Sequence, residues 1–117
     1  MDEKSIIQFI EQQTGSERRI TSAQAVSFCC NYFKISKEAF FSRSKSRDIT
    51  NCRHHAMYIL KNYTVKSYPE IARDLGNLDH TTVMYGFRRI KGLVEKDSVL
   101  EREIAEMVHK IKLGDGI

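Results

Sequence analysis

Three polar residues in a row, His80, Thr81 and Thr82, are followed two turns of a helix later by Arg88 and Arg89. Imidazole and hydroxyl groups can hydrogen-bond to base edges, and a threonine methyl group can meet the methyl group of thymine. The cations behind them suit phosphates, which position a protein without carrying sequence information. This order of residue types favours a helix that enters the major groove of DNA by its N-terminal end.

The segment just before these residues predicts a helix-turn-helix. Ser67 and Glu70 form a capping box that starts a helix, and Pro69 lies in its first turn, where a missing N–H is harmless. Gly76 then ends this helix, and Asp79 is a suitable N-cap for the next one. A helix, a short turn that contains glycine and a second helix are the parts of that motif.

The cysteines and histidines of the sequence do not favour a metal site or a catalytic thiol. Cys29 and Cys30 fall on an apolar helical face, which is typical of inert core thiols. Neighbouring histidines on a helix face different ways, and no recognised ligand spacing is present. The sequence therefore predicts no catalytic residue, no cofactor and no metal. The residues that a metal site would have to use are Cys52, His54, His55 and His80.

Composition is that of one soluble globular domain with a basic middle. The chain has 117 residues, 41% hydrophobic and 29% charged, and a formal net charge of +4. Residues 43–91 hold ten Lys and Arg against four Asp and Glu, so the rest is slightly acidic. That distribution suits a nucleic-acid surface, and it equally suits a merely solvated one. Three cysteines without C-x-x-C, no signal peptide and no long apolar run indicate a cytoplasmic protein with reduced thiols.

Hydrophobic periodicity is helical nearly throughout, so we predict an all-α fold, a compact helical bundle. A long helix from about Ser46 to Asn62 should bury Ile49 and Tyr63 among others. Its outward residues Arg47, His54 and Lys61 are seven apart and form one ridge, with Arg53 beside it. This ridge would either grip phosphates or only keep the helix solvated. Other helices are expected within residues 2–13, after Thr21, after Ser36 and from Ser98.

The chain resembles the C-terminal DNA-binding domain of the bacterial chromosomal replication initiator DnaA. The most specific likeness is Asp79-His80-Thr81-Thr82-Val83 followed by Arg88-x-Ile90. Supporting segments are Ser67-x-Pro69-Glu70-Ile71, Ile20-Thr21, Tyr32-Phe33-x-Ile35 and Ser42-Arg43-Ser44-Lys45-Ser46-Arg47. The resemblance covers residues 20 to 113. It departs from the family at Asn51-Cys52-Arg53-His54, where a proline usually stands next to the arginine, at Leu78, and at Lys45, which replaces a frequent arginine.

The resemblance implies a TrpR/DnaA C-terminal-like bundle that binds double-stranded DNA at a short, AT-rich, DnaA-box-like site. It implies Lys45 in the minor groove as one of the base-reading residues, which are Lys45, Asp79, His80, Thr81 and Thr82. Phosphate contacts are expected from a second set, which is Arg47, Arg53, His54, Lys61 and Arg88. The family's box is asymmetric and nothing resembles a zipper, so a monomer should suffice. No contact with a membrane is expected.

We predict three parts: an N-terminal helix and short linker in 1–19, the DNA-binding domain in 20–113, and a tail in 114–117. The N-terminal helix could dock a protein partner. The chain lacks the G-x-x-x-x-G-K-[ST] phosphate loop of an ATPase. We therefore expect a stand-alone, non-enzymatic binding domain of a bacterium, phage or mobile element, acting in replication initiation or its regulation. The alternative is an interaction or transcription-regulatory module that kept the fold but lost box specificity.

Overall fold

The structure is a computed structural model that describes residues 20–114, and within them it contains only helices and connecting segments. The helix predicted within residues 2–13 lies outside the described residues. The observed architecture confirms the predicted all-α fold. The six helices in the described range are α2 (Ser22–Phe33), α3 (Lys37–Phe40), α4 (Arg47–Tyr63), α5 (Tyr68–Asp74), α6 (His80–Lys96) and α7 (Ser98–Lys112).

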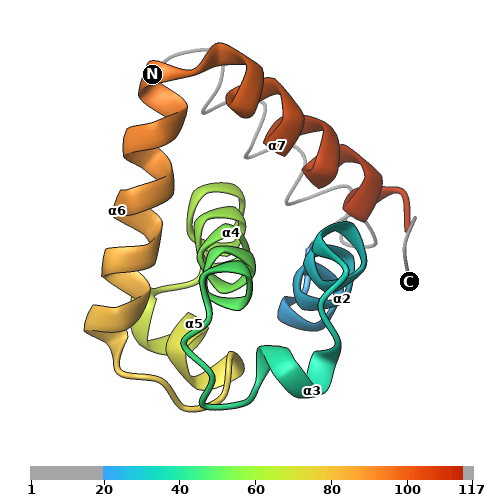
Figure 1. Cartoon of the computed structure of the whole chain (residues 1–117). Helices are drawn as coiled ribbons and strands as arrows, with labels where there is room; N and C mark the ends of the chain where they lie inside the picture. The colour runs from blue at the N-terminus through green and yellow to red at the C-terminus, as the bar shows by residue number, and fades with distance from the viewer. Residues whose placement is uncertain (1–19, 115–117) are drawn as a thin grey trace.

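Helix α4 lies at the centre, and the other helices surround it (Figure 1). Its residues 54–60 form an unbroken buried run, so this helix is enclosed on every side along that length. Ile59 and Leu60 are fully buried and pack with Ile90 of α6 and Ile104 of α7 in one core. Burial of each such side chain contributes about 1.5–3 kcal/mol to folding.

Two residues predicted for the core of α4 are only partly buried. Ile49 lies in the first turn of the helix and Tyr63 is its last residue. The enclosed run ends before it reaches either terminal turn, which is why helical periodicity alone overestimated their burial.

Short polar side chains fix where the helices begin. The Thr21 hydroxyl accepts from the Gln24 N–H at 3.0 Å, and the Gln24 side chain accepts in return from the Thr21 N–H. The last helix begins at Ser98, as expected. Asp97 is the N-cap, because its carboxylate accepts from the backbone N–H groups of both Val99 and Leu100, at 3.0 and 3.2 Å.

Helices α5 and α6 form the predicted helix-turn-helix. The capping box of Ser67 and Glu70 starts α5, as the sequence indicated. Gly76 has a φ of +106° and Asn77 a φ of +57°, so the chain reverses through two left-handed residues. The N–H of Leu78 then donates to the Ala72 carbonyl at 2.9 Å, which ties the turn to the end of α5.

Helices α4 and α6 cross closely at Gly86, which is buried. A Cβ atom at Gly86 would lie 2.8 Å from Cδ2 of His54 and would overlap Sδ of Met57. The absence of a side chain is therefore what lets α6 approach the central helix at this point. Gly92, nearly two turns further along α6, has no such neighbour. A Cβ atom added to it would meet nothing within 4 Å.

We predict opposite effects for alanine at these two glycines. Gly86→Ala should lower the free energy of unfolding by about 1–3 kcal/mol, because the methyl group overpacks the crossing. Gly92→Ala should raise it by about 0.5–1 kcal/mol, because alanine favours a helix without meeting anything. Urea denaturation of both variants measures the effects. Equal effects at the two positions would contradict the close crossing.

Candidate nucleic-acid interface

The N-terminal turn of α6 is organised by Asp79. Its Oδ1 accepts from the Thr81 N–H at 2.9 Å and from the Thr81 hydroxyl at 2.8 Å. These two hydrogen bonds lower the pKa of the Asp79 carboxyl below its ordinary value, so the cap is ionised at neutral pH. Asp79 thus positions Thr81, and its predicted base contact stays a prediction.

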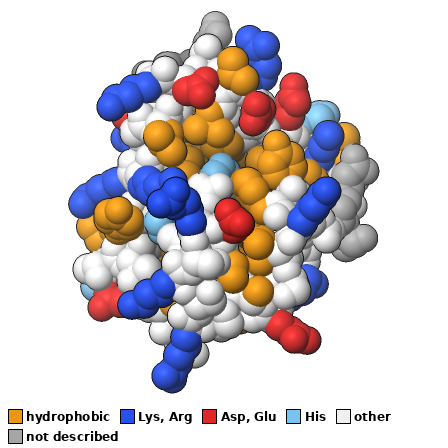
Figure 2. Space-filling view, viewed as in Figure 1, with side chains coloured by type: hydrophobic (Ala, Val, Ile, Leu, Met, Phe, Trp, Pro, Cys, Tyr) orange, Lys and Arg blue, Asp and Glu red, His pale blue; other side chains and the backbone are white. Residues whose placement is uncertain are grey.

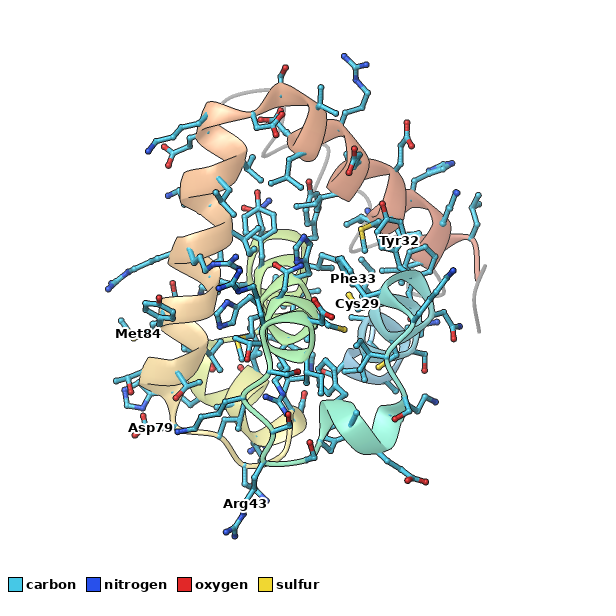
Figure 3. All side chains as sticks on the ribbon, viewed as in Figure 1. Cys29, Tyr32, Phe33, Arg43, Asp79 and Met84 are labelled. Atoms are coloured by element: carbon cyan, nitrogen blue, oxygen red, sulfur yellow. The ribbon has the colours of Figure 1, made fainter. Side chains whose placement is uncertain are left out.

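The three polar residues that follow Asp79 are all exposed. His80 has 57% of its side-chain surface exposed, and Thr81 and Thr82 are also exposed. The loop before α4 reaches the same end of the molecule, since Arg43 and Asp79 are both in the lower part of Figure 3. The structure therefore brings the loop that contains Lys45 to the same edge as the start of α6.

Several basic side chains lie at this edge. Figure 2 shows Lys and Arg along the α6 side and the lower end of the molecule, and others at the top and along the opposite side. Lys45, Arg47 and Arg88 are exposed. Lys61 is partly buried and holds its Nζ 4.6 Å from the centre of the Tyr68 ring, which limits its freedom before any ligand arrives.

Arg53, for which we predicted a phosphate contact, makes several hydrogen bonds within the protein. Its guanidinium group donates four hydrogen bonds to carbonyl oxygens at the end of α3 and in the loop between α3 and α4, so most of its five N–H groups are occupied. Because these bonds hold the loop against α4, Arg53 is a structural residue. The acceptors are the carbonyls of Ala39, Phe40, Ser42 and Ser44, at 3.2, 2.7, 2.7 and 2.6 Å.

His54 does not lie on the outward ridge where we predicted it, because it is buried and uncharged. Only 7% of its surface is exposed. Burial, with the nearby Arg89 charge, lowers its pKa from 6.5 to about 4, so it carries no charge with which to attract a phosphate at neutral pH. It belongs instead to the α4–α6 contact, where its ring also meets the edge of Tyr85.

A cleft between the start of α4 and the middle of α6 adds residues that the sequence did not single out. Arg89 appeared in the sequence only as one of several cations, and Asn51 and Tyr85 had no expected role. The spacing of Tyr85 and Arg89, four residues apart on one helix, is the signal that could have suggested a shared surface. The cleft has a volume of about 530 Å³ and is lined by Lys45, Arg47, Thr50, Asn51, His54, Tyr85 and Arg89.

The thiols do not form a second reactive site. Cys29, Cys30 and Cys52 are free and buried. Burial raises the pKa of all three, and that of Cys52 reaches about 12, which keeps them protonated and poorly reactive. Among residues 20–114, no group of three or more His, Cys, Asp or Glu side chains could hold a metal ion.

Within that range no helix has the length and apolar character needed to cross a membrane.

Comparisons with known proteins agree with this geometry. Residues 23–90 match the family described as the bacterial dnaA protein helix-turn-helix. The chromosomal replication initiator protein DnaA of Jannaschia sp. (strain CCS1) is 34% identical over 96 residues, which are 82% of this chain and 20% of that protein. DnaA of Rhodopseudomonas palustris (strain BisA53) is 31% identical over 112 residues, 96% of this chain and 23% of that protein. The chain spans about a fifth of the length of these relatives.

We predict that Arg53→Ala destabilises the fold by about 2–3 kcal/mol, because several carbonyls lose a charged donor at once. Arg53→Lys should recover little, since an ammonium group cannot reproduce the planar fork. Urea denaturation measures both, with the exposed Arg47→Ala as the control, which should change stability by less than about 0.5 kcal/mol. Equal stability of the Arg53 and Arg47 variants would show that the loop does not depend on these bonds.

The lowered pKa of His54 predicts a pH-dependent stability. An unfolded chain takes up a proton near the ordinary pKa of 6.5, whereas the folded chain resists protonation of His54 until about pH 4. Stability should therefore fall as the pH drops through this window, by about 2 kcal/mol between pH 6.5 and about pH 5. His55, whose pKa is also lowered by burial, adds in the same direction.

Urea midpoints at about pH 7 and pH 5 measure this loss. The His54→Gln variant should show a smaller loss, and His109→Gln, at an exposed position, should show the full one. A wild-type midpoint that does not change with pH would contradict the buried, neutral state of His54.

Proposed function

Because the chain belongs to the bacterial DnaA helix-turn-helix family, we propose that it binds double-stranded DNA with α6 in the major groove. The observation that carries the proposal is the N-terminal turn of α6. There His80, Thr81 and Thr82 are exposed together, held by the Asp79 cap. Side chains of this size and polarity can reach base edges when a helix enters the groove end first.

The cations around this turn supply the sequence-independent part of binding. Arg47 and Arg88 are exposed, and Lys61 is held over Tyr68, so all three can approach phosphates. Lys45, on the loop before α4, is proposed to enter the adjacent minor groove, whose negative potential attracts basic side chains. Arg53 and His54 are not proposed to contact DNA directly.

We propose further that the preferred DNA is a DnaA-box-like site and that the protein acts in replication initiation or its regulation. Support comes from the relatives, which are named chromosomal replication initiators. The proposed unit is residues 20–113, acting as a monomer in the bacterial cytoplasm. Recognition is non-covalent, because the matching family is a helix-turn-helix and the proposed contacts are hydrogen bonds and ion pairs.

A second candidate, an interaction module, is favoured by one observation. A groove of about 270 Å³ lies between α2, α4, α6 and α7 and is mostly apolar. Tyr32 and Leu93 at this groove are 49% and 42% exposed, which is a large apolar surface to leave in water. This groove lies away from the start of α6, so the two functions are separable by mutation.

Fluorescence anisotropy tests the DNA proposal. A labelled duplex with an initiator box and a scrambled duplex are titrated across a salt series. A preference of about 10³-fold or more for the box supports sequence-specific recognition. Equal and steeply salt-dependent binding to both would leave only a basic surface. Absence of binding to either duplex would favour the interaction module.

Two substitutions separate base reading from phosphate contact. Thr82→Ala should reduce the preference for the box by about 1–3 kcal/mol, because it removes both the hydroxyl and the methyl group. Lys61→Ala should weaken all duplexes alike and reduce the salt slope by about 1. The same anisotropy series measures both variants. Equal losses on the box and on scrambled DNA for Thr82→Ala would remove its base-reading role.

A further inference from the structure

The cleft between α4 and α6 is lined by three cations and by no carboxylate. Lys45 and Arg47 come from the start of α4 and the loop before it, and Arg89 comes from the middle of α6. Three positive charges at one cleft without an acidic partner repel one another, so an anion that enters would relieve the repulsion. The charge of the lining thus indicates an anionic ligand.

Arg89 is held in place before any ligand arrives. Its Nη1 lies 3.2 Å from Oδ1 of Asn51 and 3.3 Å from Nδ1 of His54, both on α4. Among the described residues, both of its hydrogen bonds use this one nitrogen, so its other N–H groups can still donate. An arginine that is fixed through one nitrogen can donate its remaining N–H groups to an oxyanion.

His54 can hold Arg89 only while it is neutral. Nδ1 must accept the hydrogen bond from Arg89, and a protonated imidazole cannot accept. The burial of His54 ensures the neutral state at physiological pH. Tyr85, 65% exposed, stands with its ring against His54 at 5.7 Å and adds a hydroxyl donor at the cleft.

The position of Arg89 relative to the base-reading turn identifies the source of the anion. Thr82 and Arg89 are seven residues apart on α6, so they lie on nearly the same side of the helix, about 10 Å apart along its axis. The major groove is about 12 Å wide. When Thr82 lies at a base edge, Arg89 therefore lies near the rim, where the backbone phosphates are.

We propose that this cleft binds a single phosphate of the DNA backbone, with Arg89 as the principal donor and with Asn51 and His54 as the residues that position it. The inference rests on the proposed function, since it names a contact of the same DNA-binding surface. Arg47, Lys45 and the Tyr85 hydroxyl surround the same phosphate. The contact fixes the register of α6 in the groove.

A scan with modified duplexes tests the contact. Phosphates of the box duplex are replaced one at a time by neutral methylphosphonates, and anisotropy measures the affinity of each duplex. The affinity of wild-type protein should fall about tenfold when the phosphate that occupies the cleft is neutralised. This is the loss expected of one charged hydrogen-bonded contact. Arg89→Ala should bind the unmodified duplex about tenfold more weakly than wild-type protein does. Its affinity should not fall further when that phosphate is neutralised.

Arg88→Ala is the matched control, because it removes the same type of side chain from the next position of α6. Arg88 does not line the cleft, so this variant should keep the full loss at the cleft phosphate. If Arg89→Ala keeps the wild-type pattern at every phosphate, the inference is wrong although the protein binds DNA. If wild-type protein binds no duplex, the proposed function fails and the inference fails with it.

Two further measurements complete the test. His54→Gln retains an acceptor and should keep the phosphate pattern, whereas His54→Leu should resemble Arg89→Ala, provided that circular dichroism shows both variants folded. If His54→Leu is unfolded, Asn51→Ala replaces it and should weaken the cleft contact.

Titration with inorganic phosphate separates the sources of the anion. Binding of inorganic phosphate with an unchanged methylphosphonate pattern in Arg89→Ala would overturn the assignment to DNA.

Discussion

The close crossing of α4 and α6 at Gly86 is the contact on which the rest of the structure depends. A side chain there would meet Met57 and His54, so α6 could not lie where it does. The crossing buries Ile90 against the central helix and leaves the opposite side of α6 in water. It also buries His54, whose neutral ring then accepts from Arg89. Packing at one glycine therefore decides which side chains α6 can offer to a ligand.

Cations of the basic middle have different roles because their surroundings differ. Arg53 is occupied by backbone carbonyls and holds the loop before α4. Arg89 is fixed by one nitrogen and keeps its other donors available, whereas Arg88 is simply exposed. On net charge alone, these three arginines would be equivalent. Their partners separate them into a structural residue, a positioned donor and a surface cation.

The local parts of the fold were predictable, because capping boxes, glycine turns and helical periodicity depend on residues close in sequence. The helix-turn-helix and the start of α2 are examples. The misjudged features are tertiary: the partial exposure of Ile49, the carbonyl contacts of Arg53 and the burial of His54 depend on how different elements pack together. The cleft at Arg89 was missed for the same reason, since α4 and α6 contribute to it together.

We propose that one edge of the molecule, formed by the start of α6, the start of α4 and the loop before it, contacts DNA. Mapping of backbone amide chemical shifts by NMR during titration with a box duplex tests this claim most directly. Shifts should concentrate on residues 43–51 and 79–89 and leave Tyr32 and α7 unchanged. Shifts concentrated on α2 and α7, with the start of α6 unaffected, would contradict it.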